Sequence, residues 1–315
     1  MKALTFAGLL LLVLSFPCRS QVDDLSPQPG WERSVIPGAT EMNLLDVAWT
    51  GDLVIAVGTL NRIFTSPDAI RWTERNVDSA YRLAFRSITF SEAGYVVVGT
   101  SGAPGAHGAI AFSPDAESWR LVTPISVPEL WEVIWTGSRF VAVGGQGCIL
   151  SSGDGVSWSF EPRLTADTIT AVASSSSAVV AGTNAGAVIT GWPGQSWKIL
   201  KDGAMSGRRI GHLHWTGHRY LAAASGRLFA STDVGAWSEI ETDGFSVWSI
   251  YRGPDSYYLL VNPADDPHVS HQFRLSKDLI NFDVEDFGAK YVRDIAWSPI
   301  GFVVVTDRGL VLIRR

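Results

Sequence analysis

Carboxylates, arginines and tryptophans recur along this sequence at equivalent positions. Each follows closely after an apolar residue and precedes a run of β-forming residues. The members of this set are Asp46, Arg86, Trp131, Glu132, Trp248, Arg293 and Asp294. A carboxylate pair such as Asp46 with Glu132 or Asp294 could supply the acid and base of glycoside hydrolysis. Charges of both signs beside tryptophan also suit the binding of a polar ligand, a glycan or a peptide. A third interpretation is an ion-pair ring that only seals a channel.

The elements that must position these residues come from an internal repeat. Val47-Ala-Trp-Thr-Gly51 followed by Val54-Ile-Ala-Val-Gly58 returns with anchors at positions 47, 88, 133, 172, 213, 250 and 295, which are 41, 45, 39, 41, 37 and 45 residues apart. Each copy consists of short β-branched or aromatic runs broken by Gly, Asp and Ser, which is typical of hairpins. About four short strands in a repeat near 40 residues make one propeller blade. The sequence therefore predicts an all-β, seven-bladed β-propeller of four-stranded blades.

A second motif follows most anchors and has the form Ser-x-Asp-x-x-x-Trp/Phe. Its five copies are Ser66, Asp68 and Trp72; Ser113, Asp115 and Trp119; Ser152, Asp154 and Trp158; Ser231, Asp233 and Trp237; and Ser276, Asp278 and Phe282. The segment Gly191 to Trp197 keeps only the aromatic residue. We expect the Asp carboxylate to close a turn by accepting backbone N–H groups, and the aromatic ring to fill the space between blades.

This motif resembles the sialidase-type Asp-box (BNR) repeat, over nearly the whole chain after residue 20. The resemblance implies that the boxes are structural turns between the third and fourth strands of a blade. The residues just before each inner strand would then ring the channel mouth on the opposite face. These pairs are Leu45-Asp46, Arg86-Ser87, Trp131-Glu132, Thr170-Ala171, Gly211-His212, Trp248-Ser249 and Arg293-Asp294.

The seventh copy ends at Arg315, before any box. Ser26 to Trp31 looks like a degenerate box, and Trp31 to Ile36 like the strand after it. We expect this strand to pair with the C-terminal strands, so that the two ends of the chain share the last blade and leave no open sheet edge.

Two loops on the mouth face are longer than their counterparts. One spans Thr100 to Ala109 and contains His107. The other spans Asn262 to Phe273 and contains Asp265, Asp266, His268 and His271. They could rim a binding mouth or be tolerated insertions. His268-x-x-His271 could bind a divalent ion, but an acidic surface loop has the same composition, so we expect neither a metal site nor a cofactor.

The N-terminus has the three parts of a secretory signal peptide: Lys2, the apolar run Ala3 to Phe16, and Cys18-Arg-Ser20. We place cleavage after Ser20, which leaves 21–315 as a single propeller domain; the alternative is a lipid anchor on Cys18. Cys148 is then the only cysteine, and no Asn-x-Ser/Thr sequence occurs. These features favour an exported bacterial protein, periplasmic or secreted, with no integral membrane segment after cleavage.

Charge and motifs limit the function. With 25 Lys and Arg against 31 Asp and Glu, the net charge of −6 argues against nucleic-acid binding. Sialidases have six blades and an Arg-Ile-Pro motif that is missing here, and Asp-box xyloglucanases use two propellers. We therefore expect a non-enzymatic scaffold that binds a protein or glycan on the face opposite the Asp-boxes. The alternative is a glycoside hydrolase of the sialidase-like superfamily that uses the mouth carboxylates.

At the level of the repeat, the chain is also similar to the photosystem II assembly factor type of exported propeller. Only Arg86 and Arg293 supply positive charge at the predicted mouth. The basic patch of that family is therefore not clear in this sequence, and its photosynthetic role is not carried over.

Overall fold

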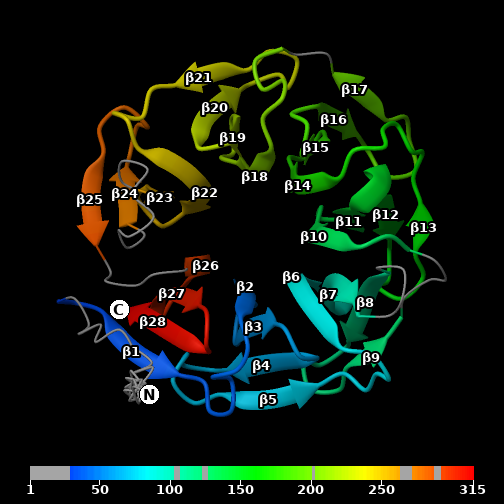
Figure 1. Ribbon diagram of the computed structural model, residues 1–315, viewed down its shortest axis with the longest axis vertical. Coiled ribbons are helices and arrows are strands. Elements are labelled where there is room, and N and C mark those ends of the chain that lie inside the picture. Colours follow the sequence, from blue (N-terminus) through cyan, green and yellow to red (C-terminus); the bar gives the residue numbers. More distant parts are fainter. Residues whose placement is uncertain (1–28, 103–106, 123–126, 201–202, 263–271, 287–291) are drawn as a thin grey trace, which may run out of the picture.

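The computed structural model describes residues 29–102, 107–122, 127–200, 203–262, 272–286 and 292–315. These residues form seven antiparallel sheets of four strands, arranged as a ring around a central channel (Figure 1). The predicted seven-bladed β-propeller is confirmed. The first strand of each repeat lies nearest the channel and the fourth lies at the outer surface.

The blades are numbered from the first complete repeat. Blade one contains β2 (Leu44–Trp49), β3 (Val54–Gly58), β4 (Arg62–Ser66) and β5 (Thr73–Asn76). Blade two contains β6 (Leu83–Ser91), β7 (Gly94–Ser101), β8 (Gly108–Ser113) and β9 (Arg120–Leu121). Blade three contains β10 (Leu130–Trp135), β11 (Phe140–Gly144), β12 (Ile149–Ser152) and β13 (Ser159–Phe160), with a short 3-10 helix over Gly145–Gly147. Blade four contains β14 (Ile169–Ser174), β15 (Val179–Thr183), β16 (Val188–Gly191) and β17 (Lys198–Leu200).

The remaining blades complete the ring. Blade five contains β18 (Ile210–Trp215), β19 (Tyr220–Ala224), β20 (Arg227–Ser231) and β21 (Ser238–Ile240). Blade six contains β22 (Ser246–Arg252), β23 (Tyr257–Asn262), β24 (Gln272–Ser276) and β25 (Asp283–Asp286). Blade seven contains β26 (Val292–Ser298), β27 (Gly301–Thr306), β28 (Leu310–Arg314) and, as its outer strand, β1 (Glu32–Val35).

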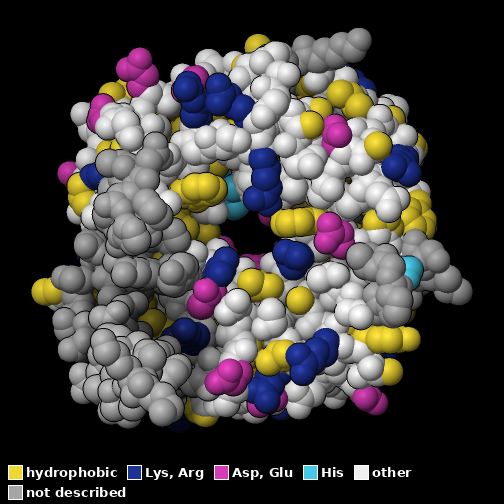
Figure 2. All heavy atoms as spheres, in the orientation of Figure 1, with side chains coloured by type: hydrophobic (Ala, Val, Ile, Leu, Met, Phe, Trp, Pro, Cys, Tyr) yellow, Lys and Arg dark blue, Asp and Glu magenta, His cyan; other side chains and the backbone are white. Residues whose placement is uncertain are grey.

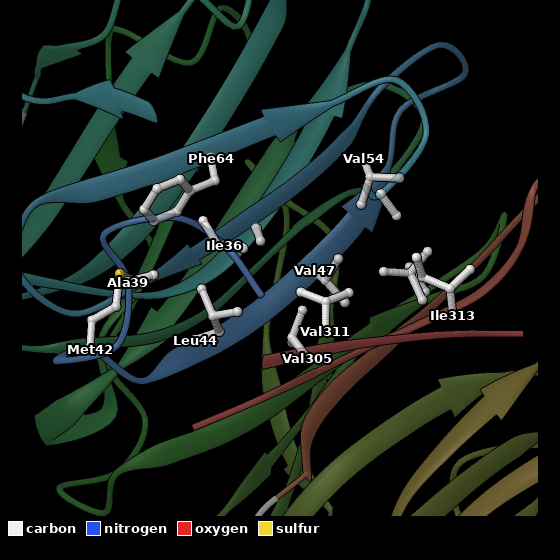
Figure 3. Close-up of a cluster of buried hydrophobic side chains, with 14 residues drawn as sticks. Ile36, Ala39, Met42, Leu44, Val47, Val54, Phe64, Val305, Val311 and Ile313 are labelled. Carbon is white, nitrogen blue, oxygen red and sulfur yellow. The ribbon is translucent and has the colours of Figure 1, made fainter. Parts of the chain in front are cut away.

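The two ends of the chain close the ring as predicted. β1 pairs with β28 in a register that places Glu32 opposite Ile313 and Val35 opposite Leu310. A buried cluster joins this last blade to blade one; Figure 3 shows Val47 and Leu44 facing Val305, Val311 and Ile313. Burial of these side chains stabilises the seam through the hydrophobic effect.

The second strand of each blade explains why the sequence repeats runs such as Val-Ile-Ala-Val. All five residues of β3, of β11 and of β15 are buried. A sheet that is packed on both faces requires apolar side chains at consecutive positions and not an alternating pattern. Each blade therefore packs between two neighbours, and the core is divided into clusters between adjacent blades.

The Asp-box turns have the geometry that the motif suggests. In each of the five copies, Asp Oδ1 accepts the backbone N–H groups two and three residues further on, at 2.7–3.1 Å. The residue after each Asp has a positive φ, as at Ala69 (60°) and Val234 (67°). In the four boxes that end in Trp, the indole N–H donates to the carbonyl of that same residue.

Two box sequences lack the Asp, and their aromatic residues bind a carboxylate from the preceding blade instead. Glu161, just after β13, accepts hydrogen bonds from the Gly194 amide and from the Trp197 indole at 3.1 Å each. Glu285, on β25, accepts one from the Trp31 indole at 3.2 Å. Both glutamates lie three residues after the aromatic residue of their own box, so equivalent residues reach across the blade boundary to the blade-four turn and to the Trp31 side chain.

Candidate functional site

A cavity of about 760 Å³ occupies the end of the channel at which the inner strands begin. Figure 2 shows a central opening with Lys/Arg and hydrophobic side chains around it. All seven residues predicted to form the mouth line this cavity: Asp46, Arg86, Trp131, Glu132, Trp248, Arg293 and Asp294. The structure thus brings together residues that are up to 248 positions apart in the chain.

A β-bulge divides these residues into two layers. In every blade, the pairing between the first and second strands skips one residue at the same place. The skipped residues, which we call the rim, are Leu45, Arg86, Trp131, Thr170, Gly211, Trp248 and Arg293. The residues that follow them, the collar, are Asp46, Ser87, Glu132, Ala171, His212, Ser249 and Asp294. Bulges re-aim side chains in this way.

The collar lies deeper in the channel than the rim. Glu132 and His212 also line a second cavity of about 380 Å³ toward the far end of the channel, and no rim residue does so. Close approach of the bulged backbone explains a recurrent glycine: a Cβ on Gly144 would lie 2.0 Å from the Glu129 carbonyl oxygen. Glycine at this position lets the bulge form without a steric clash.

In five of the seven blades, a collar side chain ties the inner strand to the next one. Asp46 Oδ2 accepts the Ile88 N–H at 2.7 Å, and Glu132 Oε2 accepts the Val172 N–H at 2.8 Å. Three more collar residues accept from the next blade: Ser87 from Val133 at 3.2 Å, His212 Nδ1 from Ile250 at 3.4 Å, and Asp294 Oδ2 from Val47 at 3.0 Å.

The remaining two junctions use neighbouring side chains. Blade four has Ala171 in the collar, and its Thr170 hydroxyl donates to the Ile210 carbonyl at 2.6 Å instead. Blade six reaches blade seven through the Tyr251 hydroxyl, which donates to Asp294 Oδ1 at 2.9 Å. Side-chain hydrogen bonds therefore bridge every blade boundary along the channel.

The structure does not form the ion-pair ring considered from the sequence. Among the described residues, no salt bridge joins a rim arginine to Asp46, Glu132 or Asp294. These carboxylates accept hydrogen bonds from backbone N–H groups of the next blade, so they connect neighbouring strands and do not form an ion-pair ring.

Burial disfavours the ionised forms of two collar carboxyl groups, Asp46 and Glu132. Burial, followed by the neighbouring Asp294 charge, raises the pKa of Asp46 well above its ordinary value. Burial also raises the pKa of Glu132 to about 8, against the opposing effect of the Val172 N–H. The same cause lowers the pKa of His212 to about 3, which keeps this imidazole neutral and able to accept its hydrogen bond.

The rim contains groups without such partners. The Arg86 guanidinium carbon lies 4.3 Å from the centre of the Trp131 ring, and that of Arg209 lies 5.2 Å from it. Arg86 Nε and Trp131 Nε1 are buried and have no hydrogen-bond partner among the described residues. Trp248, across the opening, is 49% exposed. Burial lowers the pKa of Arg86, an effect that the carboxylate of Glu129 opposes.

Arg209 is the mouth residue that sequence reasoning missed. It lies one position before the apolar residue Ile210, whereas the predicted ring was read only from the two positions after it. Arg209 adds a third arginine to the cavity lining, beside Arg86 and Arg293. Arg293 differs from the other two because it makes two hydrogen bonds to Asp307, at 2.7 and 2.9 Å.

Several other predictions fall outside the described residues. They are the cleavage site and Cys18, the central part of the Thr100–Ala109 loop, and the Asp265, Asp266, His268 and His271 cluster. No group of three potential metal ligands occurs in the described part of the chain. Cys148 is buried, which raises the pKa of its thiol to about 11. No described helix is long and apolar enough to cross a membrane.

The architecture can be compared with solved structures. One solved structure, of YCF48 bound to D1 peptide, has a TM-score of 0.70 and 16% identity, over 90% of this chain and 94% of that chain. This chain is similar in fold to YCF48. YCF48 from Cyanidioschyzon merolae gives 0.67 and 17%, over 91% of this chain and 98% of that one. The WD40 propeller domain of Doa1 gives 0.66 and 12%, over 92% and 96%.

No protein-family model matches this sequence, and neither does any curated protein. At these identities the likeness to YCF48 shows the propeller fold alone. It supports, at the level of fold, the expected similarity to the photosystem II assembly factor type of propeller.

Proposed function

We propose that this chain is an exported, non-enzymatic scaffold that binds a segment of a partner protein at the channel mouth. The observation that carries the proposal is that rim and collar residues differ in their hydrogen bonding. Arg86 and Trp131 line a large cavity, and each has one buried side-chain N–H without a partner among the described residues, whereas the carboxylates of Asp46 and Glu132 accept backbone N–H groups. Buried unsatisfied donors call for an explanation, and a ligand that accepts hydrogen bonds provides one.

The chemistry of the rim favours an acidic or carboxylate-bearing peptide segment. Arg86 and Arg209 make no salt bridge with any described residue, and both lie against the Trp131 ring. Arginine fits carboxylates through paired N–H donors, and arginine and tryptophan are the residues most enriched at energetically dominant interface positions. That YCF48, a protein of similar fold, has been solved with a bound peptide supports a peptide over a glycan.

The proposal is tested by affinity capture from an exported fraction, with residues 21–315 as bait and mass spectrometry as the readout. A stoichiometric protein partner is expected with the wild-type bait and is expected to be lost with the Arg86→Ala/Trp131→Ala variant. An Arg120→Ala/Phe160→Ala bait is the matched control, since it removes an arginine and an exposed aromatic residue from outer strands. Capture that survives the mouth variant would contradict the proposed site.

Glycoside hydrolysis is the second candidate, and the raised pKa of Glu132 is the observation that favours it. A carboxyl group that keeps its proton near neutral pH has the property required of a general acid. Turnover of a polysaccharide panel by the wild-type protein, lost in Glu132→Gln and in Asp46→Asn, would replace the scaffold proposal by this one.

A further inference from the structure

A separate groove lies between blades four and five, on the face that carries the Asp-box turns. Its volume is about 470 Å³, within the range of about 300–1,000 Å³ that small-ligand sites occupy. Its walls come from the degenerate turn of blade four (Trp192, Gln195, Ser196), the hairpin turn of the same blade (Ser175, Ser177, Ala178), and the Asp-box turn of blade five, including Asp233.

The groove exists because blade four departs from the repeat at several neighbouring places. The first strand of blade three ends at Trp135, opposite Phe140, whereas that of blade four ends at Ser174, opposite Val179. The residue before the second strand is arginine in blade three, Arg139, and alanine in blade four, Ala178. Blade four therefore has smaller side chains at the two positions that Trp135 and Arg139 occupy in blade three, which leaves this space open.

The turn of blade four lacks the Asp of the regular boxes but is still held in place. Pro193 occupies the place of the Asp, and the turn is held by Glu161 from blade three, which binds both Gly194 and Trp197. Gly194 keeps the positive φ of the regular boxes, at 75°. Trp192 and Gln195 are thus presented on a fixed backbone, which lowers the entropy lost when a ligand binds.

The lining chemistry indicates the class of ligand. Two indole rings, Trp192 and Trp215, lie on the groove, and Trp215 is packed against Tyr220 with ring centres 4.6 Å apart. Serine hydroxyls and the Gln195 amide also line the groove. The charged lining residues are one cation, Lys198, and one anion, Asp233, so the groove has no net charge of its own.

We propose that this groove binds a neutral oligosaccharide, with sugar rings stacked on Trp192 and Trp215. Flat aromatic faces match the apolar faces of sugar rings, and the surrounding hydroxyl and amide groups match their hydroxyls. Trp215 also lines the 380 Å³ cavity at the channel end on this face, so the groove and that cavity adjoin at this ring. This proposal does not depend on the function of the mouth.

The test is isothermal titration of the full mature chain with β-1,4-linked hexaoses of glucose, xylose, mannose and N-acetylglucosamine. At least one hexaose is expected to bind. Ala178→Arg introduces into blade four the side chain that blade three carries at the same position, and is expected to weaken binding at least tenfold without removing any group. Trp192→Ala, which removes one stacking surface, is expected to weaken it by a similar factor.

Ser256→Arg is the matched control, because it adds the same side chain at the equivalent position of blade six, outside the groove. It is expected to leave hexaose binding within twofold of wild type. The proposal is overturned if none of the four hexaoses binds, or if binding survives Ala178→Arg. It is equally overturned if Ser256→Arg weakens binding as much as Ala178→Arg, or if binding is lost in Arg86→Ala/Trp131→Ala and kept in Ala178→Arg, which would move the ligand to the mouth.

Discussion

The rim and the collar of the channel mouth are one residue apart in the chain and have opposite roles. Collar residues such as Asp46 and Glu132 accept backbone N–H groups from the next blade. Rim residues such as Arg86 and Trp131 keep donors that no described residue satisfies. A β-bulge, repeated in every blade, thus separates collar residues that hold the ring together from Arg86 and Trp131 on the rim; in blade four the rim residue Thr170 makes the bridge instead.

Removal of a collar acceptor is expected to give the largest effect of the three changes that test this difference. Asp294→Ala removes the acceptor of the Tyr251 hydroxyl and one of the two acceptors of the Val47 N–H, which keeps Asp46 Oδ1 at 2.8 Å. Leaving one buried donor unsatisfied costs about 1–3 kcal/mol. We expect a loss of about 2 kcal/mol in the free energy of unfolding, measured by urea denaturation at pH 7.

Asp294→Asn is the control, since its amide oxygen can still accept one of the two bonds. It is expected to lose less than half as much stability as Asp294→Ala. Partner capture by the folded Asp294→Ala protein should match that of the wild type. Loss of capture with unchanged stability would show instead that the collar contacts the ligand.

The fold was predictable from the sequence because the repeat is regular. The division of the mouth residues into rim and collar was not predictable. Spacing of the anchors near 40 residues requires blades, and the incomplete seventh copy requires the strand at Trp31 to Ile36 to close the ring. The bulge is a property of the backbone. Its residue is Leu45 in one blade and Gly211 in another, so no residue type marks it.

Contacts between blades were the other part that the sequence could not supply. Glu161 binds a turn more than 30 residues away, and a local pattern does not indicate which blade a side chain will reach. A signal does exist in retrospect. The third residue after a box aromatic is polar where it reaches the next turn, as in Glu161 and Glu285, and apolar in Val122 and Ile240.

The second test uses the pH dependence of stability. The pKa of Glu132 is about 8 in the folded protein, against an ordinary value near 4.5. The folded state therefore keeps a proton that the unfolded state loses between these values, and stability falls as the pH rises from about 4.5 to about 8. Glu132→Gln has no such proton to lose, and its amide oxygen can still accept the Val172 N–H.

We therefore expect Glu132→Gln to match wild type near pH 4.5 and to exceed it by about 1 kcal/mol at pH 8. Full burial would give about 1.4 kcal/mol for each unit of pKa shift, but Glu132 faces an open cavity, where solvent screens part of this energy. Chemical denaturation of both proteins at several pH values measures the difference. A constant difference between pH 4.5 and 8 would mean that Glu132 is ionised in the folded ring at all of these pH values.

Arg293→Ala is expected to have the smallest effect on stability. It tests whether position on the rim is sufficient for ligand binding, and we expect that it is not. Arg293 occupies the same bulge position as Arg86, but its guanidinium is already bound by both oxygens of Asp307. An ion pair that is partly exposed, as this one is, contributes about 0.2–1 kcal/mol to stability. We expect a loss within that range and less than a threefold change in partner affinity. An affinity loss as large as that of Arg86→Ala would show that the ligand displaces Asp307 and that Arg293 binds it together with Arg86.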